Sequence, residues 1–299
     1  MRSSALLALL VPLARSSKDF RADVKSLEDS FGINAKNAQV PGLWVAQAAQ
    51  LIPQLERIAE SYTGSKGATV RVSLPVRMAS AHPVAALKLA LERHGSDKHN
   101  KAHNYTMTYS QILHILGRKA ALRVLEVGMG TNKTTGFSTM GAKGRPGASL
   151  RAWRDYLPNA AVFGCDIDEA ILFNNEPRIR TTRVDQLDFD FASFLALYGL
   201  FGGRPFDLLI DDGLHALGSS LNTLTFALGP AVRPGGFIVI EDIASYQVPA
   251  FRTVDALLRS NPALRTYLIK PTTTPPTKKV KNYLYVVHKC AAAASGLRG

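Results

Sequence analysis

The chain has 299 residues, 46% of them hydrophobic and 20% charged, so it is long enough to bury a sizeable core. The formal net charge of +13 favours partners that carry negative charge, although a basic solvated surface would give the same balance. Cys165 and Cys290 are the two cysteines, so neither a disulfide framework nor a cysteine zinc site is expected. No apolar run reaches the roughly 18–20 residues that cross a bilayer.

Residues 1–17, MRSSALLALLVPLARSS, place an arginine before a mostly apolar run, which is typical of a signal or transit segment. The alternative is an N-terminal helix docked on the domain, because no clean small-x-small cleavage site follows. We favour a cytoplasmic protein and keep the targeting segment as the alternative. Residues 18–94 repeat apolar side chains at steps of three and four, which predicts a helical region that covers a pocket or makes homo-oligomer contacts.

From about residue 120 short apolar strands alternate with helical segments. This pattern predicts an α/β fold with a doubly wound, seven-stranded, mostly parallel sheet of Rossmann-like type. The last two strands, LRTYLIKP and NYLYVVHK, have no helix between them and should form an antiparallel C-terminal hairpin. We place this domain at residues 95–290 and expect a flexible tail at 291–299.

Glycines and an acid follow the first predicted strand, in LEVGMGTN. Gly128 and Gly130 allow a tight turn and close approach of a ligand, and Glu126 precedes them. A nicotinamide fold would need a third glycine where Lys133 stands, and Glu126 would repel a pyrophosphate. The carboxylate would instead attract the ammonium group of S-adenosylmethionine, which carries no phosphate. A purely structural turn is the alternative.

The second and third predicted strands also end in polar residues. Asp166 could accept the ribose hydroxyls of a nucleoside, and Asp185 and Gln186 could reach an adenine edge. Asp168 or Asp188 could substitute in these roles, although either could simply cap a helix. The order of the three features along the chain fits an adenosine ligand.

The fourth and fifth predicted strands end in carboxylates, within DDGLH and IVIED. Asp212, Glu241 and Asp242 should meet at one rim of the sheet, where three hard oxygen ligands suit Mg²⁺ or another hard divalent cation. A dication would lower the pKa of a substrate hydroxyl, and His215 could then take its proton. The alternative is that the aspartates cap helices and that His215 is structural.

The segment from Gly95 to about Lys289 resembles class I S-adenosylmethionine-dependent methyltransferases. Within them it is most similar to the metal-dependent sugar O-methyltransferases of macrolide biosynthesis, of the macrocin and mycinamicin type. The motifs that carry the resemblance are GSDKHNKAHNYTMTY, VLEVGMGTN, GASLRAWRDYLPNAAVFGCDID, RVDQLDF, LLIDDGLHA and GGFIVIEDI. The resemblance implies methyl transfer from S-adenosylmethionine to a hydroxyl of a sugar or glycosylated small molecule.

Carried over onto this sequence, the resemblance makes Asp212, Glu241 and Asp242 the metal ligands and His215 the general base. Asp211 then faces the cofactor or caps a helix. The long glycine-rich stretch 133–149 departs from the family pattern and could be a lid over the cofactor.

Other features and functions remain open on the sequence. The side chains of His99, His103, Tyr105 and Tyr109 could line the substrate mouth or cover the cofactor, or be structural. An RNA or protein methyltransferase is suggested by the charge, but no aromatic–basic RNA-binding motif is seen. A non-catalytic cofactor-binding scaffold is the third alternative.

Overall fold

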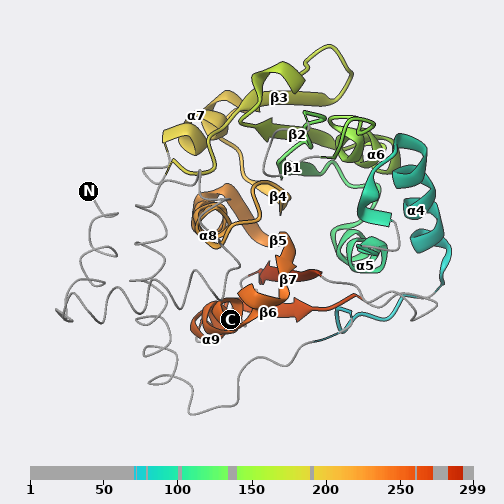
Figure 1. Cartoon of the computed structure of the whole chain (residues 1–299). Helices are drawn as coiled ribbons and strands as arrows, with labels where there is room; N and C mark the ends of the chain where they lie inside the picture. The colour runs from blue at the N-terminus through green and yellow to red at the C-terminus, as the bar shows by residue number, and fades with distance from the viewer. Residues whose placement is uncertain are drawn as a thin grey trace, which may run out of the picture. The chain divides into compact units, whose positions relative to one another are not determined.

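The computed structural model describes residues 71–291, apart from 72, 79, 100–102, 134–139, 189–191, 260 and 272–281 (Figure 1). The chain divides into a larger unit, residues 69–244 and 261–299, and a smaller one, residues 1–68 and 245–260. In the smaller unit the structure describes the short helix η4 (Ser245–Gln247) and α9 (Val248–Arg259). The predicted targeting segment 1–17, most of the predicted helical region 18–94 and nearly all of the predicted tail lie outside the described residues, as does part of the predicted lid.

One seven-stranded sheet forms the centre of the larger unit, in the order β3-β2-β1-β4-β5-β7-β6. Its strands are β1 (Arg123–Val127), β2 (Ala161–Asp166), β3 (Ile179–Arg183), β4 (Phe206–Asp211), β5 (Val232–Ala244), β6 (Leu264–Ile269) and β7 (Asn282–Lys289). Strands β1 to β5 pair in parallel, whereas β7 is antiparallel to both β5 and β6. The predicted doubly wound sheet and its antiparallel hairpin are therefore confirmed.

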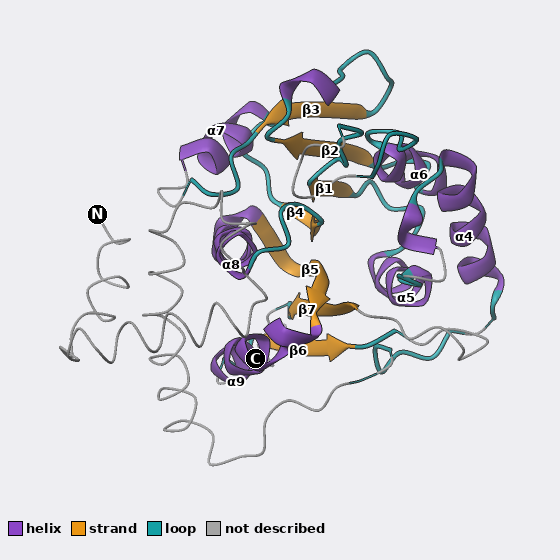
Figure 2. Cartoon of the chain, viewed as in Figure 1, coloured by secondary structure: helices purple, strands orange, loops and turns teal. Residues whose placement is uncertain are grey.

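Helices cover both faces of this sheet. They are α4 (His82–His94), α5 (Thr106–Leu116), α6 (Ala148–Tyr156), α7 (Ala192–Leu200) and α8 (Leu217–Phe226), with the short turns η1 (Asp97–His99), η2 (Glu169–Ile171) and η3 (Ala227–Ala231). Figure 2 shows α4, α5 and α6 on one face of the sheet and α7 and α8 on the other. Central strand residues such as Val124, Leu208 and Val239 are fully buried, as expected for a parallel sheet that is covered by helices on both faces.

The end of α4 directs the chain toward the edge of the sheet where the candidate site lies. Gly95 adopts a left-handed φ of 76° and its N–H donates to the Glu92 carbonyl, while the Ser96 N–H donates to the Leu91 carbonyl. This Schellman-type end satisfies the last carbonyls of the helix. The chain then turns directly into η1, which carries Lys98.

A β-bulge interrupts β5 near its carboxyl end. The pairing with β7 shifts register between Ile240 and Ile243, and Asp242 between them has a φ of 54°. A bulge redirects side chains. Here Glu241 is buried, while Asp242 lies at the partly open rim.

The turn after β1 packs directly on the turn after β4. The Asp212 N–H donates to the Val127 carbonyl at 2.8 Å, and Gly128 has a φ of 88°. A Cβ on Gly128 would lie 2.1 Å from the carbonyl oxygen of Asp212. Both the conformation and the close approach therefore require glycine.

Cys165 and Cys290 are both free thiols. Among the described helices, none is both long enough and apolar enough to cross a membrane.

We expect Gly128→Ala to lower the free energy of unfolding by more than about 3 kcal/mol, because the added methyl must displace the Asp212 backbone. Gly202→Ala is the matched control, since Gly202 has a φ of 86° but open space around it. It should cost about 1–2 kcal/mol from the left-handed conformation alone. Urea unfolding measures both, and equal losses would contradict the close-approach argument.

Candidate metal and cofactor site

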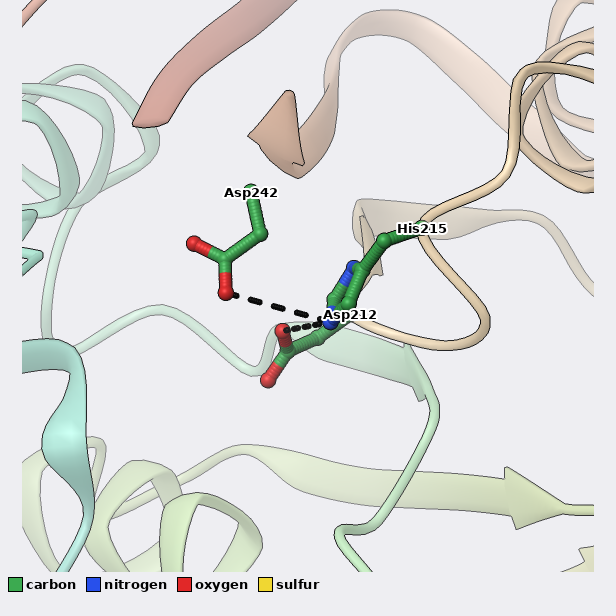
Figure 3. Close-up of side chains that lie close together, drawn as sticks. All are labelled: Asp212, His215 and Asp242. Carbon is green, nitrogen blue, oxygen red and sulfur yellow. Dashed lines mark ion pairs between the residues drawn. The ribbon is translucent and has the colours of Figure 1, made fainter. Parts of the chain in front are cut away.

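Three side chains converge at the carboxyl ends of β4 and β5 (Figure 3). Asp212, His215 and Asp242 each offer one ligand atom, and these atoms all lie within 4.8 Å of one another. His215 Nε2 is 3.9 Å from Asp212 Oδ1 and 3.8 Å from Asp242 Oδ2. Two hard carboxylate oxygens and an imidazole at this spacing can hold a divalent cation.

Backbone conformation singles out two of these three residues. In the described part of the chain four non-glycine residues have positive φ, and they include His215 at 58° and Asp242 at 54°. The left-handed conformation costs non-glycine residues energy, and such strain collects at functional sites. The fold therefore maintains two unfavourable backbone conformations to bring these side chains together.

A buried lysine lies behind the open site. Lys98 is 1% exposed, and its Nζ lies 2.5 Å from Asp212 Oδ2, 2.8 Å from Glu241 Oε2 and 3.2 Å from Glu126 Oε1. Burial alone would lower the pKa of Lys98, but the surrounding carboxylates raise it well above its usual range. The ammonium therefore stays charged and offsets part of the negative charge.

Glu241 faces this lysine and not the open group. Its Oε2 accepts from Lys98 and its Oε1 accepts from the Tyr109 hydroxyl, so both oxygens have donors. Burial raises the pKa of Glu241 well above its usual range. The structure thus brings the three predicted ligands close together, but Glu241 lies behind the rim and the open group consists of Asp212, His215 and Asp242.

Asp242 also contacts Tyr105 and His103, from the segment that precedes β1. The Tyr105 hydroxyl donates to Oδ1, and His103 Nε2 lies 3.5 Å from Oδ2. Burial would raise the pKa of Asp242, but the neighbouring His215 and His103 and the Tyr105 hydrogen bond lower it overall. This aspartate is therefore kept ionised, as a metal ligand must be.

The first predicted cofactor residue, Glu126, is fully buried and engaged within the protein. Its Oε1 accepts from Ser149 Oγ at 2.7 Å, and its Oε2 accepts from Trp153 Nε1 at 2.7 Å. Together with Lys98, these donors hold the carboxylate beneath the turn formed by Gly128 and Gly130, which both have left-handed φ.

Asp166 connects the ends of the first two strands. Its Oδ2 accepts from the Met129 N–H at 2.8 Å, and its Oδ1 accepts from the Asp168 N–H at 2.9 Å. The residue is partly exposed, so its remaining lone pairs can still accept from the hydroxyls of a ribose. Asp168 itself accepts from Thr131 and Lys133.

Gln186 organises the loop between β4 and α8. Its Nε2 donates to Asp211 Oδ1 at 2.6 Å and to Thr223 Oγ1 at 2.9 Å, while its Oε1 accepts from the Leu214 N–H. The predicted adenine contact would therefore come from Asp185, which is partly exposed and accepts from the Leu187 N–H.

Asp211 and Asp188 occupy different surroundings. Asp211 is 1% exposed, and its Oδ2 has no hydrogen-bond partner among the described residues. Burial raises the pKa of Asp211. Asp188 accepts from both the N–H and the hydroxyl of Ser193 at the start of α7, which matches the helix-cap interpretation.

Sequence reasoning assigned no chemistry to Lys98 and no specific partner to Tyr105 or Tyr109. Two partners of Lys98 lie 114 and 143 residues further along the chain, so no local spacing distinguishes it from a surface lysine. The signal that was available is the motif itself, GSDKHNKAHNYTMTY, which precedes the first strand and carries all three residues.

Known proteins with similar sequences are sugar O-methyltransferases. No protein-family model matches the chain. A tetracenomycin rhamnosyl 3'-O-methyltransferase of Streptomyces olivaceus is 37% identical over 195 residues, covering 65% of this chain and 44% of that protein. Mycinamicin VI 2''-O-methyltransferase of Micromonospora griseorubida is 39% identical over 136 residues, covering 45% and 30%. The chain therefore spans less than half the length of these relatives.

Among solved structures, the chain is similar to the methyltransferase MycE from the mycinamycin biosynthetic pathway, in complex with Mg and SAH. The match has 26% identity and a TM-score of 0.51 and covers 71% of this chain and 56% of that one. A MycE complex that also holds mycinamycin VI matches with a TM-score of 0.53 at 23% identity. The resemblance expected from the sequence and the class I methyltransferase fold are both confirmed.

The carboxylates of this site should make the stability of the metal-free protein pH-dependent. Burial raises the pKa of Asp212 to about 6, against the opposing effects of Lys98 and His215. The folded state then binds more protons than the unfolded state just below that pH, so this group adds stability as the pH falls. Unfolding in EDTA at about pH 7, 6 and 5 should show wild type gaining stability relative to Asp212→Asn. A constant or shrinking difference would contradict the raised pKa.

Proposed function

We propose that this protein is an S-adenosylmethionine-dependent, Mg²⁺-dependent O-methyltransferase that acts on a hydroxyl of a sugar or glycosylated small molecule. The observation that carries the proposal is the convergence of Asp212, His215 and Asp242 beside the glycine turn after β1. The similarity to sugar O-methyltransferases, together with a solved relative that binds Mg and SAH, supports the same activity.

The residues at the rim fit a hard divalent cation. Asp212 and Asp242 would hold it through carboxylate oxygens, and Glu241 is the further ligand that the resemblance implies. Each Glu241 oxygen already accepts one hydrogen bond, from Lys98 or from Tyr109, so Glu241 would ligate through a remaining lone pair. When bound, Mg²⁺ would lower the pKa of a substrate hydroxyl and orient its oxygen.

The neighbouring strand ends fit the nucleoside of the cofactor. Gly128 and Gly130 form a left-handed turn after β1, and the Gly128 N–H donates to Cys165 near the end of β2, the edge of the sheet where ligands bind in folds of this kind. Asp166 would accept from the ribose hydroxyls, and Asp185 would contact the adenine. S-adenosylmethionine supplies the methyl group on its sulfonium.

The chemical step then requires a proton acceptor on the side of the substrate. The substrate hydroxyl oxygen forms a bond to the methyl carbon as the bond from that carbon to sulfur breaks, and the electron pair of that bond goes to sulfur. The hydroxyl proton goes to His215, whose ring lies between the two aspartates. His215 therefore acts as the general base, as the resemblance implies.

His215→Ala and Asp242→Asn should distinguish the role of His215 as general base from the role of Asp242 as metal ligand. We expect His215→Ala to lose about 100-fold or more in turnover while Mn²⁺, used as a spectroscopic substitute for Mg²⁺, still binds. Asp242→Asn should weaken Mn²⁺ binding by about tenfold or more, because one anionic ligand is lost. Mn²⁺ titration by electron paramagnetic resonance and a methylation assay on glycosylated macrolides measure the two effects.

Metal removal provides the control for the whole proposal. EDTA should abolish turnover while S-adenosylhomocysteine still binds by calorimetry, and added Mg²⁺ should restore turnover. Full activity in EDTA would overturn the metal-dependent mechanism. If His215→Ala lost Mn²⁺ binding as well as turnover, His215 would be a ligand and not the base.

A further inference from the structure

Lys98 is buried, and its ammonium contacts carboxylates at the ends of three strands. It lies on η1, immediately after α4, and its ammonium is surrounded by carboxylates from β1, from β5 and from the residue that follows β4. These three strands are neighbours in the sheet. The ammonium donates hydrogen bonds to Asp212 and Glu241 and forms an ion pair with Glu126, so the burial of its charge is compensated.

This arrangement divides the two oxygens of Asp212 between two different surroundings. Oδ2 accepts from Lys98 at 2.5 Å, on the buried side. Oδ1 lies on the other side, 3.9 Å from His215 Nε2, within the open group of ligand atoms. Asp242 is divided in the same way, because Tyr105 holds Oδ1 and Oδ2 faces His215.

A carboxylate can ligate a cation through one oxygen or through both. We propose that Lys98 is a positioning residue that limits Asp212 to one ligating oxygen and holds the Glu241 carboxylate in a fixed orientation. This inference rests on the proposed function, because it concerns how the chain prepares the site for its cation. The result is a site that keeps coordination positions open for water and for the substrate hydroxyl.

The same ammonium also limits the negative charge of the site. Glu126, Asp212, Glu241 and Asp242 place four carboxylates close together, and Lys98 contacts the first three of them. A unit positive charge next to the ligands repels a dication, so it weakens metal binding while it preserves the geometry. Removing it should therefore tighten metal binding and impair catalysis, a combination that general damage to the fold does not produce.

Lys98→Met tests this, because it keeps most of the aliphatic chain and removes the charge. We expect Mn²⁺ to bind about tenfold more tightly. The bound ion should also give a lower water-proton relaxivity, since Asp212 can now use both oxygens and displace water. Turnover should fall by about 100-fold or more.

Lys289→Met is the matched control. The Lys289 ammonium donates to the carbonyl oxygens of Leu228, Gly229 and Val232 and contacts no carboxylate of the site. Its loss should leave Mn²⁺ affinity, relaxivity and turnover close to those of wild type. Lys98→Gln, which keeps a neutral donor, serves as a second test variant if Lys98→Met folds poorly.

The outcomes separate the inference from the proposed function. Wild type that binds neither Mn²⁺ nor S-adenosylhomocysteine would defeat the proposed function. Wild type that binds both, with a folded Lys98→Met whose Mn²⁺ affinity and relaxivity are unchanged or whose binding is weaker, would overturn only the role of Lys98. Failure of both Lys98 variants to fold, while Lys289→Met folds, would also overturn it, because Lys98 would then serve folding itself.

Discussion

The site depends on a single buried ammonium among carboxylates. Lys98 donates to Asp212 and Glu241 and forms an ion pair with Glu126, and without it these acids would face one another across neighbouring strands in a poorly solvated region. Uncompensated charges at such positions are strongly destabilising. The lysine therefore connects Glu126, which lies next to the glycine turn, to Asp212 and Glu241 at the ends of β4 and β5.

The donors to these acids come largely from one short segment ahead of the sheet. Lys98, Tyr105 and Tyr109 all lie between the end of α4 and the first turns of α5. Their hydrogen bonds to Asp212, Asp242 and Glu241 set which carboxylate oxygens stay available at the surface. These three side chains thus support the residues of the site from the buried side.

The strand ends provide the complementary half of the site. In β5 the two adjacent acids are separated: Glu241 is buried against Lys98 and Tyr109, while Asp242, within the bulge, lies at the rim. Gln186 holds the loop that follows β4, where His215 adopts its strained conformation. Side chains held in fixed positions beside the glycine turn suit the proposed methyl transfer, because position and orientation supply much of the rate.

The sequence alone determined the alternation of strands and helices, the antiparallel hairpin, the glycine turn and the acids at the strand ends, since these depend on local periodicity and on the rule that parallel strands end at one edge. It could also bring Asp212, His215 and Asp242 to that edge. Only the tertiary structure decided which carboxylate oxygens bind buried donors and which face the open group of Asp212, His215 and Asp242. The partners of Glu241 are Lys98 and Tyr109, which lie more than a hundred residues earlier in the chain, so this contact does not follow from local pattern. Gln186 and Glu126 likewise turned out to be engaged inside the protein, because hydrogen-bond partners are chosen by packing and not by spacing along the chain.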